Sequence, residues 1–386
     1  MCYQWAVSVD RTVAFDVTPL VGTRTGLGRA VAGCLDALMA IPDGPRLLPY
    51  AFGISLSSSQ VPSGTRTIRV PTRTLLWAWS RSEWPRIDRR VRPAVVVHAT
   101  RFVAPPTRLP ELVTVHDTAF ARYPELSAGR GPRAFASLLG RAIARGAWVH
   151  CTTAAVASEV EELFGELRRE GRLVVVPFGI PPLDAVSALS NGIASRLQGH
   201  PFVLAIGRLE PRKNLPRLID AFGSIADRHA ELLLVLAGPD GPDRPRVEGA
   251  VSRLPAGVRA RVIVTGPVDE ASLAALLSSA TLLCYPSIYE GFGFPMLEAM
   301  RSGVPVVASH VAALAEVAGR ATRLVDPLDP SAIADALDEV VTDDALRRGL
   351  IDRGRARAAD FRWSDTARRL ASTYGALAGT AARISS

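Results

Sequence analysis

The sequence predicts an α/β protein with two Rossmann-like domains, whose mainly parallel sheets face each other across a cleft. Three observations predict this class. The chain has 386 residues, a length typical of two domains. Short β-branched and apolar runs alternate with helical patterns from end to end, as in repeated β-α-β units. A stretch at 180–200 lacks strand character and carries Pro, Ser, Asn and Gly, which is typical of a linker.

The predicted elements follow one another in both halves. Strands are expected within 12–20, 47–53, 94–100, 112–117, 147–153 and 173–178, and then within 202–209, 231–238, 261–266, 281–287 and 304–309. Helices are expected between them, for example over 215–229 and 271–280. We therefore expect a first Rossmann-like domain at 1–185, a second at 186–365 and a last helix at 366–386 that packs back toward the first domain.

The amino-acid composition limits the classes of protein to which the chain can belong. Apolar residues make up 48% of the chain, enough for packed cores. The chain has four scattered cysteines, which are Cys2, Cys34, Cys151 and Cys284. Without a Cys-x-x-Cys pair, they predict buried thiols in a reducing compartment rather than a zinc site. Asp10 and Arg11 interrupt the amino terminus, unlike a signal peptide, and no apolar run reaches the roughly 18 residues that span a bilayer. We expect a cytoplasmic protein, either soluble or peripheral on the inner face of the cell membrane.

Lys213 is the only lysine among the 45 basic Lys and Arg residues of a chain with net charge +8. It follows the strand predicted within 202–209, and Pro216 suits the first turn of the next helix. Arg208 adds a second cation, and Gly207 permits close backbone approach. Two cations at the carboxyl end of a strand, beside a helix amino terminus, favour a phosphate site. Lysine provides a compact charge where a second guanidinium would crowd a diphosphate. From position alone, a solvated loop lysine is the alternative.

A second motif, SIYEGFGFPMLEAM, carries Glu290 and Glu298 with seven residues between them. The backbone N–H groups of Gly291, Phe292 and Gly293 precede a helix and would meet an anion. Two carboxylates would repel phosphate, so we expect them to meet the hydroxyls of a sugar and a ribose. The alternative is that Glu298 stabilises the helix terminus and Glu290 is a surface acid.

Together these motifs resemble the family-four glycosyltransferases, retaining enzymes with the glycosyltransferase-B fold. GRLEPRKN precedes YPSIYEGFGFPMLEAMRSGVPVVAS, in the family's order. The likeness continues through HVAALAEVAGRATRLVDPLDP and the closing helix FRWSDTARRLASTYGALA, and it includes DVTPLVGTRTGLGRAV, VVVHATRFVAPP and TVHDTAFARYPE in the first half. AALAEVAG departs from the family pattern, which more often has a proline before that Glu.

The resemblance implies a role for each motif residue. The donor diphosphate would be held by Arg208 and Lys213, and the ribose hydroxyls by Glu298. The transferred sugar would contact Glu290 and, in the stretch TVHD, His116. Glu290 as a covalent nucleophile, as in retaining glycosidases, is an alternative role.

Other positions are implied mainly through their backbone. Gly26 and Gly28 open the helix GRAVAGCLDALMA and would let the first domain approach a phosphate or the acceptor. Val268, in VTGPVD, lies where the base pocket is expected. The turn 291–293 would contact the donor phosphates.

The resemblance further implies retaining hexosyl transfer from a nucleotide diphosphate sugar to a hydroxyl of a glycan, a lipid-linked sugar or a small molecule. The TGLGRA loop with TVHD resembles branches rich in mannosyltransferases, which favours mannose from GDP-mannose. Fixed cations can stabilise the departing diphosphate. Since no Asp-x-Asp has a convincing strand-end setting, we expect no metal requirement and no other cofactor.

The stretch 72–93 mixes Trp77, Trp79 and Trp84 with many arginines. Interfacial aromatics beside cations can dock on an anionic membrane, where lipid-linked acceptors lie. The alternative is a partly buried amphipathic helix with a solvated basic face.

Four further polar residues are expected to be structural. His98 and His150, at strand ends, are more often hydrogen-bonded core residues than catalytic ones. Asp326 and Asp329 are typical of a turn ahead of a helix.

Rival functions are fewer. A Walker A loop needs Gly-Lys-[Ser/Thr], and the only lysine lies between Arg212 and Asn214, which excludes a P-loop ATPase. TGLGRA stops short of the nicotinamide-binding fingerprint. A two-domain sugar-nucleotide epimerase, which needs no acceptor, is the enzymatic alternative. A nucleic-acid-binding protein rests on charge alone and would bind DNA with a steep salt dependence, so we expect no nucleic-acid partner.

Overall fold

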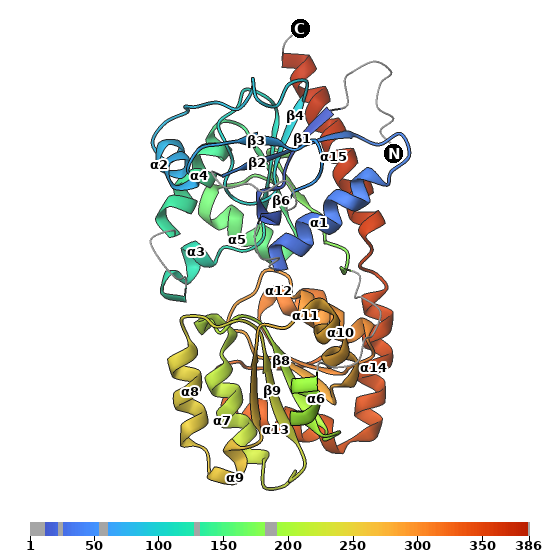
Figure 1. Cartoon of the computed structure of the whole chain (residues 1–386). Coiled ribbons are helices and arrows are strands. Elements are labelled where there is room, and N and C mark those ends of the chain that lie inside the picture. The colour runs from blue at the N-terminus through green and yellow to red at the C-terminus, as the bar shows by residue number, and fades with distance from the viewer. Residues whose placement is uncertain (1–11, 22–25, 54–60, 127–131, 182–190, 385–386) are drawn as a thin grey trace. The chain divides into compact units, whose positions relative to one another are not determined.

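The computed structural model describes residues 12–21, 26–53, 61–126, 132–181 and 191–384 (Figure 1). The chain divides into two compact units. Unit 1 comprises 1–181 and 361–386, and unit 2 comprises 182–360. The boundaries expected from the sequence lie close to these, at 185/186 and 365/366.

Unit 1 is built on a seven-stranded parallel sheet in the order β3-β2-β1-β4-β5-β6-β7. The strands are β1 (Thr12–Asp16), β2 (Arg46–Phe52), β3 (Arg66–Ile68), β4 (Val96–Ala99), β5 (Glu111–Val115), β6 (Trp148–Cys151) and β7 (Leu173–Val175). The order reverses between β1 and β4, the kind of switch point at which doubly wound sheets bind ligands.

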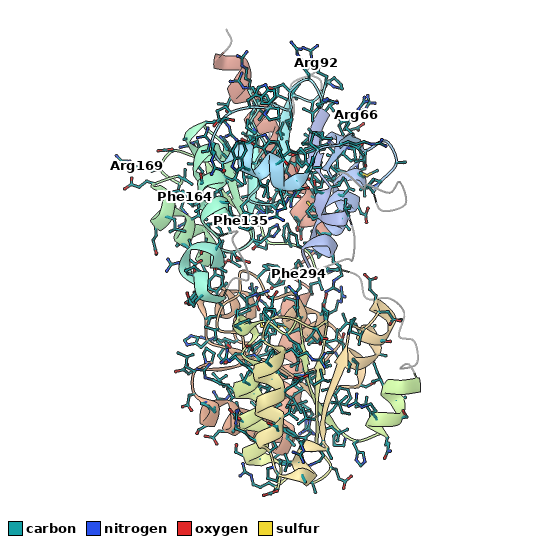
Figure 2. All side chains as sticks on the ribbon, turned by 60° about the vertical axis from the view of Figure 1, so that its left-hand side comes forward. Arg66, Arg92, Phe135, Phe164, Arg169 and Phe294 are labelled. Atoms are coloured by element: carbon teal, nitrogen blue, oxygen red, sulfur yellow. The ribbon has the colours of Figure 1, made fainter. Side chains whose placement is uncertain are left out.

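Helices cover both faces of this sheet because side chains alternate along each strand. The helices are α1 (Gly26–Met39), α2 (Thr72–Trp79), α3 (Ala119–Arg122), α4 (Pro132–Ala144), α5 (Ala154–Phe164) and α15 (Trp363–Ile384). Val13 and Phe15 of β1 pack with α1 and α15, whereas Ala14 and Val97 pack with α2. The carboxyl-terminal helix α15 therefore belongs to the core of unit 1. Exposed arginines such as Arg66, Arg92 and Arg169 project from this unit (Figure 2).

Unit 2 has a six-stranded parallel sheet in the order β10-β9-β8-β11-β12-β13. The strands are β8 (Phe202–Ile206), β9 (Leu233–Ala237), β10 (Val262–Gly266), β11 (Leu282–Tyr285), β12 (Val306–Ser309) and β13 (Arg323–Val325). The helices are α6 (Asn191–Leu197), α7 (Leu215–Ile225), α8 (Arg244–Arg253), α9 (Ala256–Arg259), α10 (Glu270–Ser279), α11 (Phe294–Arg301), α12 (Ala312–Ala318), α13 (Pro330–Thr342) and α14 (Asp344–Ala358).

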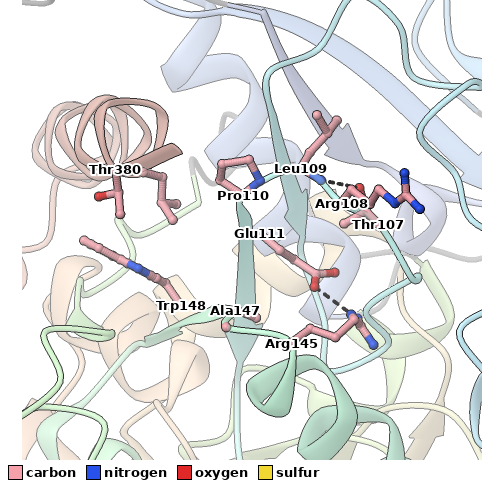
Figure 3. A pocket seen from close by; sticks show the side chains of 11 residues that line it. Thr107, Arg108, Leu109, Pro110, Glu111, Arg145, Ala147, Trp148 and Thr380 are labelled. Carbon is pink, nitrogen blue, oxygen red and sulfur yellow. Dashed lines mark hydrogen bonds and ion pairs between the residues drawn. The ribbon is translucent and has the colours of Figure 1, made fainter. Parts of the chain in front are cut away.

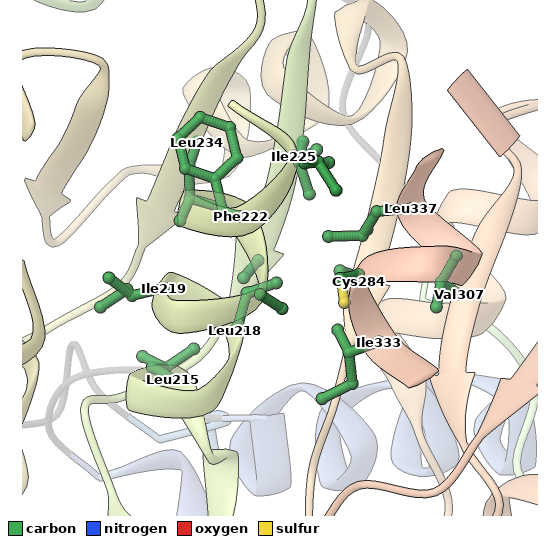
Figure 4. Close-up of a cluster of buried hydrophobic side chains, with 14 of the residues drawn as sticks. Leu215, Leu218, Ile219, Phe222, Ile225, Leu234, Cys284, Val307, Ile333 and Leu337 are labelled. Carbon is green, nitrogen blue, oxygen red and sulfur yellow. The ribbon is translucent and has the colours of Figure 1, made fainter. Parts of the chain in front are cut away.

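The core of unit 2 forms where α7 and α13 pack on the sheet (Figure 4). Leu218 and Phe222 of α7, which recur at helical spacing, are fully buried with Leu337 of α13. This packing fixes the first turn of α7, and with it the loop from β8 that carries Lys213.

The α/β class with two mainly parallel sheets is confirmed. All eleven predicted strands are present, but β3 and β13 were missed. Each has three residues and begins with an exposed arginine, so neither forms the continuous apolar run of a buried strand. The expected linker at 180–200 contains a helix, α6.

Other predictions about structural residues are also confirmed. Cys34, Cys151 and Cys284 are buried free thiols, while Cys2 lies outside the described residues. Within the described ranges, no helix combines the length and apolarity needed to cross a membrane.

Candidate active site

A buried group of charged side chains in unit 2 lies at the carboxyl edge of its sheet. The chain leaves β8, forms a 3-10 turn at Pro211–Lys213 and enters α7 through Asn214, whose φ is 59°. The Asn214 side-chain amide donates to the backbone carbonyls of Pro286 (3.0 Å) and Pro327 (2.6 Å). This amide ties the turn to the loop after β11, the strand next to β8.

Lys213 is only 8% exposed, so it is not the solvated loop lysine of the alternative interpretation. Its side chain lies across Gly207, where φ is 147° and a Cβ atom would stand 3.0 Å from Lys213 Cε. Gly207 therefore makes room for the lysine side chain. A bulkier residue there would displace it.

Lys213, Arg212, Glu290 and Tyr285 form one cluster, called here the cation–carboxylate cluster. Lys213 Nζ donates to Glu290 Oε1 at 2.5 Å and to Tyr285 Oη at 3.0 Å, and it lies 4.8 Å from the centroid of the Tyr285 ring. Arg212 Nη1 is 2.9 Å from Glu290 Oε2. Each carboxylate oxygen thus has its own cation, and the Tyr285 ring lies against the ammonium.

Burial and pairing act against each other in this cluster. Burial would raise the pKa of Glu290, but Arg212 and Lys213 outweigh it and lower that pKa to about 2. Burial lowers the pKa of the Lys213 ammonium, and the Glu290 carboxylate opposes this shift. Glu290 is therefore ionised at neutral pH and neutralises one of its two neighbouring cations.

The other residues that were predicted to bind the donor are not part of the cluster. Arg208 is half-exposed, with 53% of its side chain accessible, and its Nε donates to the Asp240 carbonyl at 3.1 Å. Glu298 is completely buried in α11. Val268 is half-buried between β10 and α10.

The turn 291–293 is buried and leads directly into α11. Gly293 caps the helix with φ at 99°, and a Cβ atom there would stand 2.6 Å from the Leu314 side chain. Gly291 and Phe292 precede it in the same turn. The sequence therefore has a glycine where both the backbone and the packing require one.

The predicted site residues of unit 1 are uncharged and lie beyond the carboxyl ends of β1 and β5. His116 follows β5 and is half-buried, and its Nε2 lies 2.7 Å from the Thr100 carbonyl oxygen. A carbonyl only accepts, so Nε2 carries the proton and Nδ1 is left as an acceptor. Burial lowers the pKa of His116, which keeps the ring neutral. Gly26 is exposed at the start of α1, where a Cβ atom would meet no other atom within 4 Å, and Gly28 is buried two residues further along.

Two histidines predicted to be structural are confirmed as core residues. His98 bonds to the hydroxyls of Tyr374 (2.6 Å) and Thr114 (2.8 Å), and His150 bonds to Thr114 (2.9 Å) and the Val176 carbonyl (2.8 Å). Both rings are fully buried.

The two aspartates expected in a turn before a helix are also confirmed in that role. Asp329 caps α13 by accepting from the backbone N–H groups of Ser331 and Ala332. Asp326 accepts from Leu328 N–H in the preceding turn.

Sequence reasoning missed two members of the cation–carboxylate cluster. Arg212 stands beside Lys213 in the same motif, but arginine occupies nearly every basic position and carries little signal on its own. Tyr285 ends an apolar strand and looked like an ordinary core residue. The proximity of Arg212 to Glu290 and of Tyr285 to Lys213 depends on β8 and β11 being neighbours, which the sequence does not state.

The sequence analysis also missed a charged pair at the switch point of unit 1, where the strand order reverses between β1 and β4. Asp16, at the end of β1, is buried and accepts from Thr18 N–H at 2.8 Å. Arg101, which follows β4, has its Nε 3.5 Å from Asp16 Oδ2. Burial raises the pKa of Asp16, and Arg101 opposes that rise.

The region that contains the cluster is similar in sequence to a known protein family. Residues 190–357 match the family described as glycosyl transferases group 1. The chain is 37% identical over 175 residues to O-antigen chain mannosyltransferase B of Escherichia coli, covering 45% of each protein. It is 35% identical over 221 residues to the phosphatidyl-myo-inositol mannosyltransferase of Mycobacterium tuberculosis, covering 52% of this chain and 56% of that protein. The chain thus spans about half the length of these curated relatives.

Solved structures cover nearly the whole chain. Sucrose-phosphate synthase from Thermosynechococcus elongatus superposes with a TM-score of 0.74 at 22% identity, covering 96% of this chain and 99% of that one. WaaG, a glycosyltransferase involved in lipopolysaccharide biosynthesis, gives 0.70 at 19% identity, covering 94% and 99%. At these identities the likeness concerns the fold, and it confirms the glycosyltransferase-B fold.

Proposed function

We propose, from the premise that residues 190–357 form a glycosyl transferases group 1 domain, that this protein is a hexosyltransferase. It would move a sugar from a nucleotide diphosphate sugar to an acceptor hydroxyl. The observation that carries the proposal is the cation–carboxylate cluster, which lies inside the matched residues at the carboxyl edge of a parallel sheet.

In this proposal the donor diphosphate binds to Lys213 and Arg208, with the amino terminus of α11 and the turn 291–293 beside it. Lys213 is held by Tyr285 and Glu290, so its charge needs little reorganisation when negative charge develops on the leaving group. Glu298 takes the ribose hydroxyls, and Val268 lines the base pocket.

Glu290 is proposed to exchange partners when the donor binds. Its two oxygens are occupied by Lys213 and Arg212 in this structure. Once the diphosphate attracts Lys213, Glu290 can accept hydrogen bonds from hydroxyls of the transferred sugar. A carboxylate held by two cations is a poor nucleophile, which favours this positioning role over a covalent one.

We propose that the transfer retains the configuration at C1. The sugar C1–O bond breaks and its electron pair goes to the diphosphate oxygen, while the acceptor oxygen bonds to C1 on the same face. The acceptor proton passes to the departing phosphate oxygen. The cations stabilise the diphosphate, so we propose that no metal or other cofactor is required. The neutral His116, with Nδ1 as acceptor, is proposed to contact a sugar hydroxyl, and Gly26 and Gly28 to lie beside a phosphate or the acceptor.

Mannose from GDP-mannose is the proposed donor substrate, since the relatives above are named mannosyltransferases. The acceptor is proposed to be a glycan or a lipid-linked sugar. A sugar-nucleotide epimerase is the weaker alternative, and turnover with donor alone would distinguish it.

A membrane surface is part of this proposal, with the protein cytoplasmic and peripheral on the inner face of the cell membrane. Trp79 is a core residue, and its indole donates to the Pro85 carbonyl at 3.0 Å. Trp77 and Trp84 are 60% and 73% exposed, and Arg81 stacks on Trp77 at 4.9 Å. The stretch 72–93 therefore combines a buried anchor with exposed aromatic and cationic groups.

Vesicle binding tests the membrane part. With anionic vesicles, exchange of both Trp77 and Trp84 for Ala should weaken partitioning by about tenfold or more. Neutral vesicles should bind weakly in both cases. Unchanged partitioning of the double variant would remove this surface from the proposal.

Calorimetric titration with GDP, UDP, ADP and dTDP, first in EDTA and then with Mg²⁺, tests the central proposal. We expect metal-free binding of GDP, weakened by about 1.5–3 kcal/mol in Lys213→Ala. Binding of none of the four under either condition would overturn the proposed donor site.

A further inference from the structure

Unit 1 contains a pocket of about 510 Å³ (Figure 3). It lies at the edge of the sheet where β5 and β6 begin, whereas His116 follows the end of β5. The pocket is lined by the first residues of β5 and β6, Glu111 and Trp148, and by α15 near Leu377. His116 follows the last residue of β5. In a parallel sheet the two ends of a strand lie on opposite edges, so this pocket is separate from the candidate active site.

The lining of this pocket, called here the amino-edge pocket, is half apolar. Pro110, Leu377 and the half-buried Trp148 supply flat or smooth apolar surface. The Trp148 indole N–H has no hydrogen-bond partner within the described part of the chain. An aromatic ring with a polar edge of this kind can cover an apolar face of a ligand and donate at its rim.

The other half of the lining is polar and carries both signs of charge. Arg145 Nη2 is 3.1 Å from Glu111 Oε2, and Arg108 is exposed nearby. Arg145 Nε and Glu111 Oε1 are buried without a hydrogen-bond partner among the described residues. These groups leave both donor and acceptor capacity unused.

This combination excludes most classes of ligand. A lipid tail would desolvate three charged side chains. A polyanion would meet Glu111, and Glu83 behind it, which already pairs with Arg145 at 2.9 Å. A neutral polyol ring has an apolar C–H face for Trp148 and hydroxyls that both donate and accept. The volume lies within the range of small-molecule sites.

We propose that the amino-edge pocket is a carbohydrate-binding site, distinct from the donor and acceptor sites, that holds one or two sugar units of a glycan chain. This proposal goes beyond the transferase proposal and does not depend on it. A chain held at this site would keep the protein near a polymeric substrate, because a second contact raises the effective concentration of the first.

Ligand-observed NMR and calorimetry with an α-mannotetraose and with maltotetraose test the proposal. We expect the wild type and Lys213→Ala to bind at least one of them equally. Trp148→Ala, Arg108→Ala and Thr380→Trp, which places bulk at the exposed rim residue Thr380, should each weaken binding about tenfold or more.

A matched control distinguishes a loss of the pocket from a general effect of substitution. Arg169→Ala makes the same change as Arg108→Ala at an exposed position that does not line the pocket, and it should bind like the wild type. If Trp148→Ala fails to fold, the two exposed variants decide the outcome.

Two results would overturn the proposal. One is the absence of binding by both saccharides at about 10 mM. The other is binding that the pocket variants leave unchanged. Failure of the nucleotide titration with intact saccharide binding would instead overturn only the transferase proposal.

Discussion

Two buried glutamates, one in each unit, show how neighbouring charges decide the ionisation of similar groups. Glu290, at the carboxyl edge of unit 2, has a cation on each oxygen, and its pKa falls to about 2 although burial opposes this. For Glu111, at the amino edge of unit 1, burial dominates and raises the pKa to about 7. Its one cation, Arg145, is shared with Glu83.

Burial therefore sets the direction in which the pKa of a buried glutamate shifts, unless enough opposite charge lies within hydrogen-bonding distance. Two cations within hydrogen-bonding distance reverse the effect of burial at Glu290, although Arg212 also pairs with Glu210 at 3.0 Å, and the one shared cation of Glu111 does not. The reversed case lies in the candidate active site, where a fixed ionised carboxylate and a fixed cation are both useful.

The largest effect is expected from removing Lys213, one of the two cations that pair with Glu290. Lys213→Ala should lower transferase turnover by about 10²–10³-fold, because it removes a preorganised charge beside the leaving group and leaves Glu290 with one cation. Donor binding should weaken by about 1.5–3 kcal/mol. Steady-state kinetics and calorimetry measure both.

Lys213→Arg and Arg348→Ala are the controls. Lys213→Arg should restore little activity, because the wide guanidinium must fit beside Gly207. Arg348→Ala changes an exposed arginine of α14 and should be neutral. Wild-type activity in Lys213→Ala would refute the proposed role of the cluster.

Glu290→Gln should reduce turnover about a hundredfold while nucleoside diphosphate binding stays near normal. The amide keeps the shape of the side chain but removes the charge that pairs with Lys213 and that is proposed to accept from the sugar hydroxyls. Rapid-quench kinetics compared with calorimetry separates the two quantities. Equal turnover in the variant would take Glu290 out of the site.

Stability should depend on pH through Glu111 in the direction opposite to Glu290. The raised pKa of Glu111 contributes stability that is complete below about pH 4.5 and lost as pH rises through about 7, a loss of about 3 kcal/mol. The lowered pKa of Glu290 contributes stability present above about pH 4.5 and lost as pH falls through about 2.

Urea unfolding of the wild type and Glu111→Gln between pH 4.5 and 7.5 measures the first contribution. The variant should show a flatter profile, whereas Glu125→Gln, at an exposed residue, should follow the wild type. Parallel profiles for the wild type and Glu111→Gln would contradict the raised pKa.

The smallest expected effect concerns Tyr285. Tyr285→Phe keeps the ring against Lys213 but removes the Oη that accepts its hydrogen bond, which should weaken donor binding by about 0.5–1.5 kcal/mol. Tyr285→Leu also removes the ring and should cost more. If both variants bind the donor diphosphate like the wild type, Tyr285 does not position Lys213.

Much of the fold was predictable from local sequence. Eleven strands were predicted from short, continuous apolar runs that alternate with helical patterns along the chain. A strand that is buried on both faces must be continuously apolar. The edge strands β3 and β13 were not predicted, because exposed residues interrupt their apolar pattern. Gly293 and Asp329 were also predictable, because a helix start requires particular backbone and capping groups.

The sequence by itself determined the kinds of residue at the carboxyl edge of the unit 2 sheet and their order along the chain. The tertiary structure decided which of them meet. Lys213 and Glu290 are 77 residues apart, and they pair because β8 and β11 are neighbours at the point where the strand order reverses. Whether a buried glutamate ionises depends on how many cations the fold brings within reach of it, and this is why Glu290 and Glu111 could not be told apart from sequence.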